Sequence, residues 1–467
     1  MKLLLLCWVC FLTVLLQTGC QVNKNGFVHK SESELEQMEK SSLAANELFI
    51  NGNLVQAEKI LKNLAKEKTV SQPLYQLEQL SVLLMGNRQD EALQLMNKIH
   101  SNMEMLFDKK LAEKAQSIWH GEVNKVYKGD AYERATFYAF MALTFIQQGN
   151  YEDAIRSVKN GLLADADSNK ADTINDYALL YYLGFFASQK MGQRDEALEY
   201  LRGMNKALQI RGCTDQQFLE TQAQKQMKLL DTVKPNVLLV IWTGAPPTVT
   251  CLGSYQEQRA IIHGKMLFDS IALSVGTGNY IPVMNNLGDI DFQATTRGGR
   301  LMDNILADKA AAKQAMNSMH GILTIVGLYM CYYGILTMPF PPVGLGFLGA
   351  GGGCLVLGFT FHIIGSFMNP KADGRYWKNL PGQLYVVPMN LPPGKHSLML
   401  TGFKHSDRIS SSLFNIEVPE TRDVSVIHLP MMRQGLEYNS VFAKKLEKER
   451  ELIQPKAASQ RMAKEIK

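Results

Sequence analysis

The chain has 467 residues, of which 46% are hydrophobic and 20% are charged. This length accommodates two or three domains, and the composition excludes a small disulfide-stabilised protein and a disordered chain. The formal net charge of +5 is too small to indicate binding to nucleic acid. Much of the charge lies in a basic tail over 436–467, which we expect to be helical and solvated.

The first 19 residues have the pattern of a bacterial lipoprotein signal peptide. Lys2 precedes a charge-free apolar run over 3–16, which is too short to span a membrane, and Gly19 precedes Cys20. Gln17 stands where such signals usually carry a large apolar residue, so an ordinary secretory signal is the alternative. We expect an exported protein acylated on Cys20, with residues 20–37 as a tether, and prefer the periplasmic face of the outer membrane over the inner membrane.

A short helical phrase recurs four times between residues 38 and 232. An Ala follows a Gly by five residues in three copies, beginning at Gly52, Gly149 and Gly192, and follows Asn87 by five in the fourth. The Gly ends one helix and turns the chain, and the Ala lets the next helix pack closely. The phrase resembles the tetratricopeptide repeat, although its spacing is irregular. We therefore expect a degenerate α-solenoid over 38–232.

Solenoids of this kind commonly hold a protein partner on their concave face. Arg134, Arg156 and Arg194 are weak candidates for partner-binding residues, since each also fits a solvated helix face. A plain helical bundle that binds nothing is the alternative for this domain.

The second half of the chain reads as a strand module interrupted by an insert. A β-rich run over 236–243 and further short runs up to 428 predict a small β-sandwich-like module. Its first part, with a helix, covers 233–313 and its second part covers 371–435. The expected fold class is therefore α+β.

The insert over 314–370 contains no Asp, Glu, Lys or Arg in 57 residues. Its two apolar runs are long enough for two passes through a bilayer, which predicts a transmembrane helical hairpin. Gly346, Gly349, Ala350 and Gly353 place small residues four apart for close packing on a neighbouring helix. Lysines on both flanks oppose the positive-inside tendency, so a hairpin buried in the protein or in an oligomer is the alternative.

A polar and aromatic cluster follows the insert directly. We expect Arg375, Tyr376 and Trp377 to lie at the membrane interface, where Trp377 would anchor the hairpin. Asp373 is expected to pair with Arg375. The basic tail has anionic lipid or a cell-wall polymer as its alternative partner.

No catalytic or metal-binding constellation is recognisable in the sequence. The nine His residues are scattered, and no two are four residues apart as on a metal-binding helix. His320 and His362, in or beside the insert, are expected to be hydrogen-bonded core residues. We expect no enzymatic activity, no cofactor and no metal.

Several segments together resemble a family of uncharacterised bacterial envelope lipoproteins. They are residues 127–134 with Leu143 and Gly149, the strand over 236–243, and the segments 373–381 and 391–394. The resemblance implies helical repeats, a Gly-rich apolar segment and a C-terminal strand module, and an accessory role beside lipoproteins that activate peptidoglycan synthases.

These observations predict a lipid-anchored scaffold of the cell envelope. Its partners would be membrane lipid, through Cys20 and the hairpin, and an unidentified envelope protein held by the repeats. The alternative is an oligomeric secretion or pore component whose hairpins insert in the membrane.

Overall fold

The structure is a computed structural model that describes nine stretches of the chain. They are residues 30–107, 125–166, 177–211, 234–276, 281–283, 286–296, 301–368, 370–404 and 407–431. Cys20, the signal peptide and the basic tail lie outside these residues. The tether expected up to residue 37 ends earlier, because a helix begins at Glu32 behind a capping box formed by Ser31 and Glu34.

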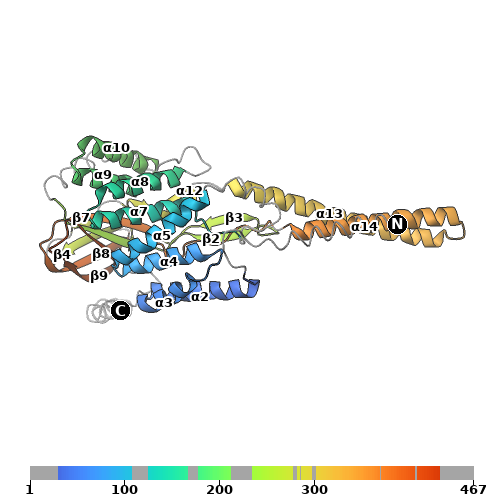
Figure 1. Cartoon of the computed structure of the whole chain (residues 1–467), viewed down its shortest axis with the longest axis horizontal. Coiled ribbons are helices and arrows are strands. Elements are labelled where there is room, and N and C mark those ends of the chain that lie inside the picture. The colour runs from blue at the N-terminus through green and yellow to red at the C-terminus, as the bar shows by residue number, and fades with distance from the viewer. Residues whose placement is uncertain are drawn as a thin grey trace, which may run out of the picture.

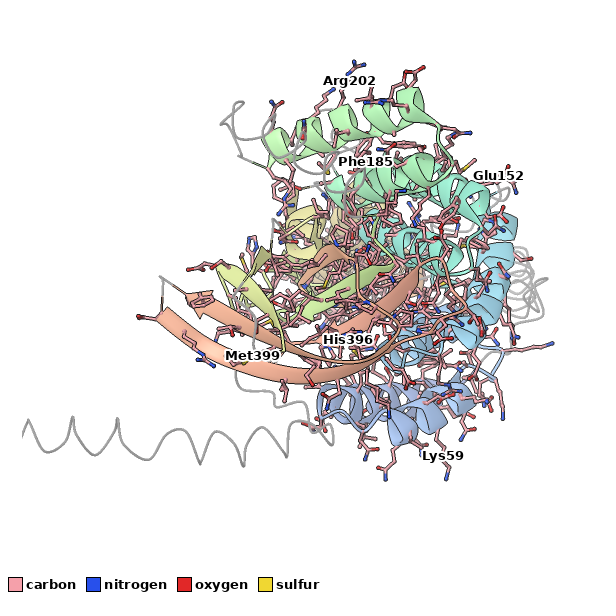
Figure 2. All side chains as sticks on the ribbon, turned by 90° about the vertical axis from the view of Figure 1, so that its left-hand side faces the viewer. Lys59, Glu152, Phe185, Arg202, His396 and Met399 are labelled. Carbon is pink, nitrogen blue, oxygen red and sulfur yellow. The ribbon has the colours of Figure 1, made fainter. Side chains whose placement is uncertain are left out.

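Within the described part of residues 30–211, eight helices form four antiparallel pairs, which confirms the repeat architecture. Their bounds are α2 (Glu32–Ile50), α3 (Leu54–Leu64), α4 (Gln72–Met85), α5 (Gln89–Phe107), α7 (Ala131–Gln147), α8 (Tyr151–Ala166), α9 (Ala178–Lys190) and α10 (Arg194–Ile210). Figure 2 shows the pairs curving around the sheets from α3, where Lys59 points outward, to α10, where Arg202 does.

The five-residue spacing in the repeat phrase has a direct backbone cause. The residue five before each Ala takes a positive φ, at 75° in Gly52, 54° in Asn87, 72° in Gly149 and 75° in Gly192. Gly adopts this left-handed conformation without strain, and Asn tolerates it better than most residues. The four Ala side chains that follow are fully buried between paired helices.

The strands form two open four-stranded sheets and a two-stranded ribbon. The first sheet has the order β10-β1-β7-β6 and the second has the order β5-β4-β8-β9, while β2 and β3 form the ribbon. Their bounds are β1 (Val237–Thr243), β2 (Thr248–Leu252), β3 (Gln258–Ile262), β4 (Ser270–Val275), β5 (Ile281–Val283), β6 (Gly288–Asp289), β7 (Gln383–Met389), β8 (Gly394–Lys404), β9 (Asp407–Val418) and β10 (Ser425–Pro430).

The first sheet lies between the helical repeats and the second sheet. In β1, Leu238 and Trp242 pack into the core of the repeats, while Leu239 and Ile241 pack into the core shared by the two sheets. All seven residues of β1 are buried. The expected sandwich is therefore present as two stacked sheets, but its outer face shares a core with the repeats rather than forming a separate module.

Side-chain amides of the repeats cover the free edge of β10. Asn87 Oδ1 accepts the backbone N–H of His428 at 2.8 Å, and its Nδ2 donates to the His428 carbonyl at 3.4 Å. Gln147 Oε1 accepts the N–H of Val426 at 3.0 Å. The amides thus satisfy strand groups that an edge would otherwise leave unpaired.

A helical hairpin projects from this layered body (Figure 1). After α12 (Ile290–Thr296), the hairpin consists of α13 (Leu301–Leu336) and α14 (Pro341–Phe367). Pro341 and Pro342 open α14, where their missing N–H groups need no partner. The expected hairpin of 314–370 is present, and α13 begins 13 residues before it.

Replacing Asn87 tests the contact between the repeats and the sheet. Asn87→Gly keeps the left-handed turn free of strain but removes both bonds to His428, so we expect it to lower the free energy of unfolding by about 1–2 kcal/mol. Asn87→Ala adds roughly 1 kcal/mol of backbone strain to this loss. Urea unfolding of the detergent-solubilised chain, followed by tryptophan fluorescence, measures the free energy of unfolding of both variants and of the parent. A glycine variant as stable as the parent would show that these bonds contribute nothing.

Candidate functional site: an apolar hairpin and its buried exit segment

The projecting hairpin exposes an unusually large apolar surface. Eighteen large apolar side chains between Met319 and Phe359 are exposed, among them Ile325 at 70% and Phe340 at 71%. Its two helices contain the candidate membrane spans Asp308–Leu336 and Pro341–Ser366, with only 11% of each apolar window buried. A monomeric soluble protein rarely exposes so large a continuous apolar patch.

Glycines bring the two helices of the hairpin into close contact. Gly344, Gly351, Gly358 and Gly365 recur every seven residues on the side of α14 that faces α13. A Cβ on Gly351 would lie 2.7 Å from the Cys331 sulfur, which leaves no room for a side chain. This packing of backbone on backbone is typical of helices in membranes.

The small residues that the sequence analysis selected for packing lie elsewhere on α14. A Cβ on Gly346, Gly349 or Gly353 would meet no atom within 4 Å, and Ala350 is exposed. Within the chain, the close approach is therefore made by the other glycine row. The packing of these small residues on a neighbouring helix therefore stays a prediction, and α13 is not that helix.

The tip of the β2–β3 ribbon lies against the base of the hairpin. Asn317 Nδ2 donates to the Tyr255 hydroxyl at 3.1 Å, and the Lys313 ammonium lies 5.1 Å from the centre of the Tyr255 ring. Lys313 also donates to the Met368 carbonyl at 2.8 Å, which joins the start and the end of the hairpin. Leu252, beside this tip, is 52% exposed.

The chain leaves the hairpin through residues 373–379, which we call the exit segment. It packs into the core that the repeats share with the first sheet, and it contacts α2, α4 and α7. Arg375 donates to both carboxylate oxygens of Asp373, to the Lys125 carbonyl at 2.8 Å and to the Ser71 hydroxyl at 3.1 Å. The predicted pairing of Asp373 with Arg375 is thus present, with both side chains almost fully buried.

The structure corrects the expectation that this cluster lies at a membrane interface. Trp377 is 1% exposed and its indole N–H lies 3.0 Å from the Ser81 hydroxyl and 2.8 Å from Asn379 Oδ1. The Arg375 side chain is 9% exposed, and Tyr376 is half-buried. Interior contacts with the repeats satisfy the polar groups that were expected to face lipid headgroups.

Two buried carboxylates of the repeats hold the exit segment. Glu133 of α7 accepts the backbone N–H of Trp377 at 2.5 Å, the Tyr127 hydroxyl at 2.6 Å and the Asp130 N–H at 2.7 Å. Glu78 of α4 lies 3.5 Å from the Lys378 ammonium, and its backbone carbonyl accepts from Asn379 at 2.8 Å. The inner face of the repeats therefore holds a segment of its own chain.

An aromatic stack continues from the exit segment into the first sheet. The Phe140 ring packs against Trp377 and stacks on Trp242 at 5.1 Å with an interplanar angle of 6°. Trp242 donates to His428 Nδ1 at 2.9 Å, and burial lowers the pKa of His428 to about 3. Both buried tryptophans thus depend on partners from other layers.

The candidate residues on the repeats lie on three different helices. Arg134 follows Glu133 in α7, Arg156 of α8 is 71% exposed and pairs with Asp153, and Arg194 opens α10. Arg156 is thus held by its own helix. The three remain candidates for binding a partner outside the occupied inner face.

Sequence reasoning missed Glu133, Glu78 and Tyr255. Glu133 follows Asp130 by three residues, which is the signature of a capping box, but nothing local shows that its carboxylate also reaches Trp377, 244 residues later. Among the described residues no group of three or more His, Cys, Asp or Glu could hold a metal ion.

Comparisons with known proteins add little to this geometry. No family model and no curated protein matches the chain. Two crystal structures of kinesin light chain TPR-like repeats from Podosopora anserina, one of them a Q17M form, match with 14% identity and a TM-score of 0.27. The matches cover 44% and 42% of this chain and 99% and 97% of the other. A likeness at this TM-score says nothing of function.

Glu133 makes the stability of the protein depend on pH. Burial, and next the charge of Asp130, raises the pKa of Glu133 from 4.5 to about 7. The folded state therefore holds this proton more tightly than the unfolded state, and its contribution to stability is fully present below about pH 4.5 and is lost as the pH rises through about 7.

We expect Glu133→Gln to remove this pH dependence and to lower stability by about 1–3 kcal/mol at pH 5, because its amide would face backbone donors. Urea unfolding between pH 5 and pH 8 measures both effects against the parent. Glu152→Gln is the matched control, because the Glu152 side chain on α8 is 71% exposed, and it should change neither the stability nor its pH dependence. Parallel pH profiles for parent and Glu133→Gln would contradict the assignment.

Proposed function

We propose that this protein is a lipid-anchored accessory protein of the bacterial cell envelope that inserts its hairpin into a membrane and has no catalytic role. One observation carries the proposal. Beyond Lys313 the hairpin contains no Asp, Glu, Lys or Arg and exposes a large apolar surface, while its base is fixed to the folded body by the exit segment.

The length of the exposed hairpin suits a bilayer. From Asn317, which contacts the body, to Leu336 are 20 residues, or about 30 Å of helix, and α14 is about 40 Å long. A hydrocarbon core is about 30 Å thick. Both ends of the hairpin lie at the body, so the body stays on one side and the turn at Thr337–Phe340 reaches the far leaflet.

Aromatic residues mark two levels along the hairpin. Tyr255 lies at the base, and Tyr329, Tyr332 and Tyr333 are exposed about 18–24 Å beyond Asn317 along the helix. Tyrosine is enriched where hydrocarbon meets water, because its ring is apolar and its hydroxyl is polar. We assign Tyr255 and Leu252 to the near interface, in place of Trp377, and the three tyrosines of α13 to the far half of the bilayer.

The anchor at Cys20 supports the same location. Acyl chains contribute roughly 0.8 kcal/mol per buried CH₂, and stable anchoring generally takes two signals. The hairpin and the acylated cysteine would be two such signals. The envelope location and the preference for the outer membrane follow from the signal pattern and the family resemblance.

A protein partner would use the outer surface of the repeats, because the exit segment and the first sheet occupy their inner face. The family resemblance points to peptidoglycan assembly as the setting for this partner. We expect Arg156 and Arg194, which are exposed, and Arg134, which is half-buried, to contact it.

The outward small-residue face of α14 favours a second candidate, in which hairpins associate into an oligomeric secretion or pore component. Gly346, Gly349, Ala350 and Gly353 are open to a neighbouring helix. Cross-linking in membranes distinguishes the two functions. A pore component should give cross-linked oligomers of one defined size, whereas an accessory protein that acts as a monomer should give no cross-linked oligomer.

A lysine on the hairpin tests membrane insertion. Ile325→Lys places a charge at a 70% exposed position of α13, which costs roughly 2.5–3.5 kcal/mol in a bilayer centre. In a Cys20→Ser background, which removes the acyl chains, we expect flotation with liposomes to fall at least tenfold. Val55→Lys, at an 80% exposed position of α3, is the control and should float like its parent. Equal flotation of the Cys20→Ser chain, its Ile325→Lys variant and its Val55→Lys variant would contradict membrane insertion of the hairpin.

Acylation is tested in cells with radiolabelled palmitate. The parent should incorporate label and Cys20→Ser should not, and globomycin should block maturation of the parent only. A Cys20→Ser chain that is labelled and fractionates like the parent would exclude the lipoprotein assignment.

A further inference from the structure

Two histidines of the charge-free insert meet across the base of the hairpin. His320 lies on α13 and His362 on α14, 42 residues later, and their ring centroids are 4.7 Å apart with an interplanar angle of 39°. The expectation of hydrogen-bonded core residues is met by His320 in its hydrogen bond to Gly358, although this side chain is only half-buried, and it is wrong for His362, which is exposed. The antiparallel turn of the hairpin brings them together, which no short sequence spacing reveals.

The hydrogen bonding of His320 fixes which nitrogen is free. Its Nδ1 lies 3.0 Å from the carbonyl oxygen of Gly358, and a carbonyl only accepts, so Nδ1 carries the proton. The other nitrogen, Nε2, then carries the lone pair. A histidine whose Nδ1–H is bonded to a backbone carbonyl while Nε2 is free has the arrangement usual for a metal ligand.

Nothing in the described part of the chain competes for the free nitrogens. His362 is exposed and makes no hydrogen bond there, and Thr324 is 3.4 Å from His320 Nδ1, the nitrogen that already donates. Residues 314–370 contain no carboxylate that could pair with either ring. The nearest cation of α13, Lys313, donates to the Met368 carbonyl and faces Tyr255.

We propose that His320 and His362 together bind one divalent transition-metal ion of the class that imidazole prefers, such as Zn²⁺, Ni²⁺ or Cu²⁺. Imidazole nitrogens hold such ions at about 2.0–2.1 Å, so two rings whose centroids are 4.7 Å apart are close enough to share one ion. The described residues supply no third His, Cys or carboxylate ligand, so water or a lipid phosphate completes the coordination.

The ion would join α13 to α14 at a point where glycine already brings them together. A Cβ on Gly358 would lie 3.2 Å from the Leu323 side chain and 3.3 Å from the His320 carbonyl. The site lies about one turn beyond Asn317, near the end of the hairpin that meets the body. It does not depend on membrane insertion, because both ligands belong to one hairpin.

Titration of the full, tag-free chain in detergent with Zn²⁺ and Ni²⁺ tests the site by calorimetry. The parent should bind one ion per chain, and His320→Gln and His362→Gln should each weaken binding at least tenfold. His396→Gln, on an exposed β8 histidine that bonds to the Pro392 carbonyl, is the matched control and should bind like the parent.

A spectroscopic measurement separates loss of ligands from loss of fold. Cu²⁺ bound to the parent should show the electron paramagnetic resonance pattern of two imidazole nitrogens, and His362→Gln should show one nitrogen or none while keeping the parent's circular dichroism. Undiminished binding in both variants, or a Cu²⁺ spectrum without nitrogen coupling in the parent, would overturn the proposal.

Discussion

The arrangement of the whole molecule depends on how the exit segment is held. Immediately after an uncharged hairpin, the chain places Asp373, Arg375 and Lys378 in the interior, where unpaired charges would be very costly. Each has a partner, and Glu133 accepts the backbone N–H of Trp377. Removing one partner would leave a buried charge alone, so these contacts fix the hairpin to the repeats in one position.

This constraint explains why the helical repeats are closed on their inner side. The exit segment, the first sheet and the aromatic stack of Phe140, Trp242 and Trp377 together fill the surface that other solenoids leave open. The repeats therefore hold their own sheet and hairpin in place. Their outer surface and the hairpin are the parts left for other molecules.

Features with a local cause were predictable from the sequence. The left-handed turn followed by a buried Ala defines each helix pair, and the absence of charge over 57 residues defines the hairpin. Contacts that join segments far apart in the chain were not predictable from the sequence. Trp377 next to an apolar hairpin has the same sequence pattern whether it faces lipid or the interior, and Glu133 looks like an ordinary cap. The unbroken apolar run of β1 was the one signal that both faces of its sheet are buried.

The central claim is that the hairpin lies in lipid. The most direct measurement is photo-crosslinking in native membranes from benzoylphenylalanine placed at Ile325, with the same group at Val55 as the reference on the body. The account predicts adducts with phospholipid at position 325 and none at position 55. Adducts at position 325 that contain only protein, or no lipid adduct there at all, would contradict it.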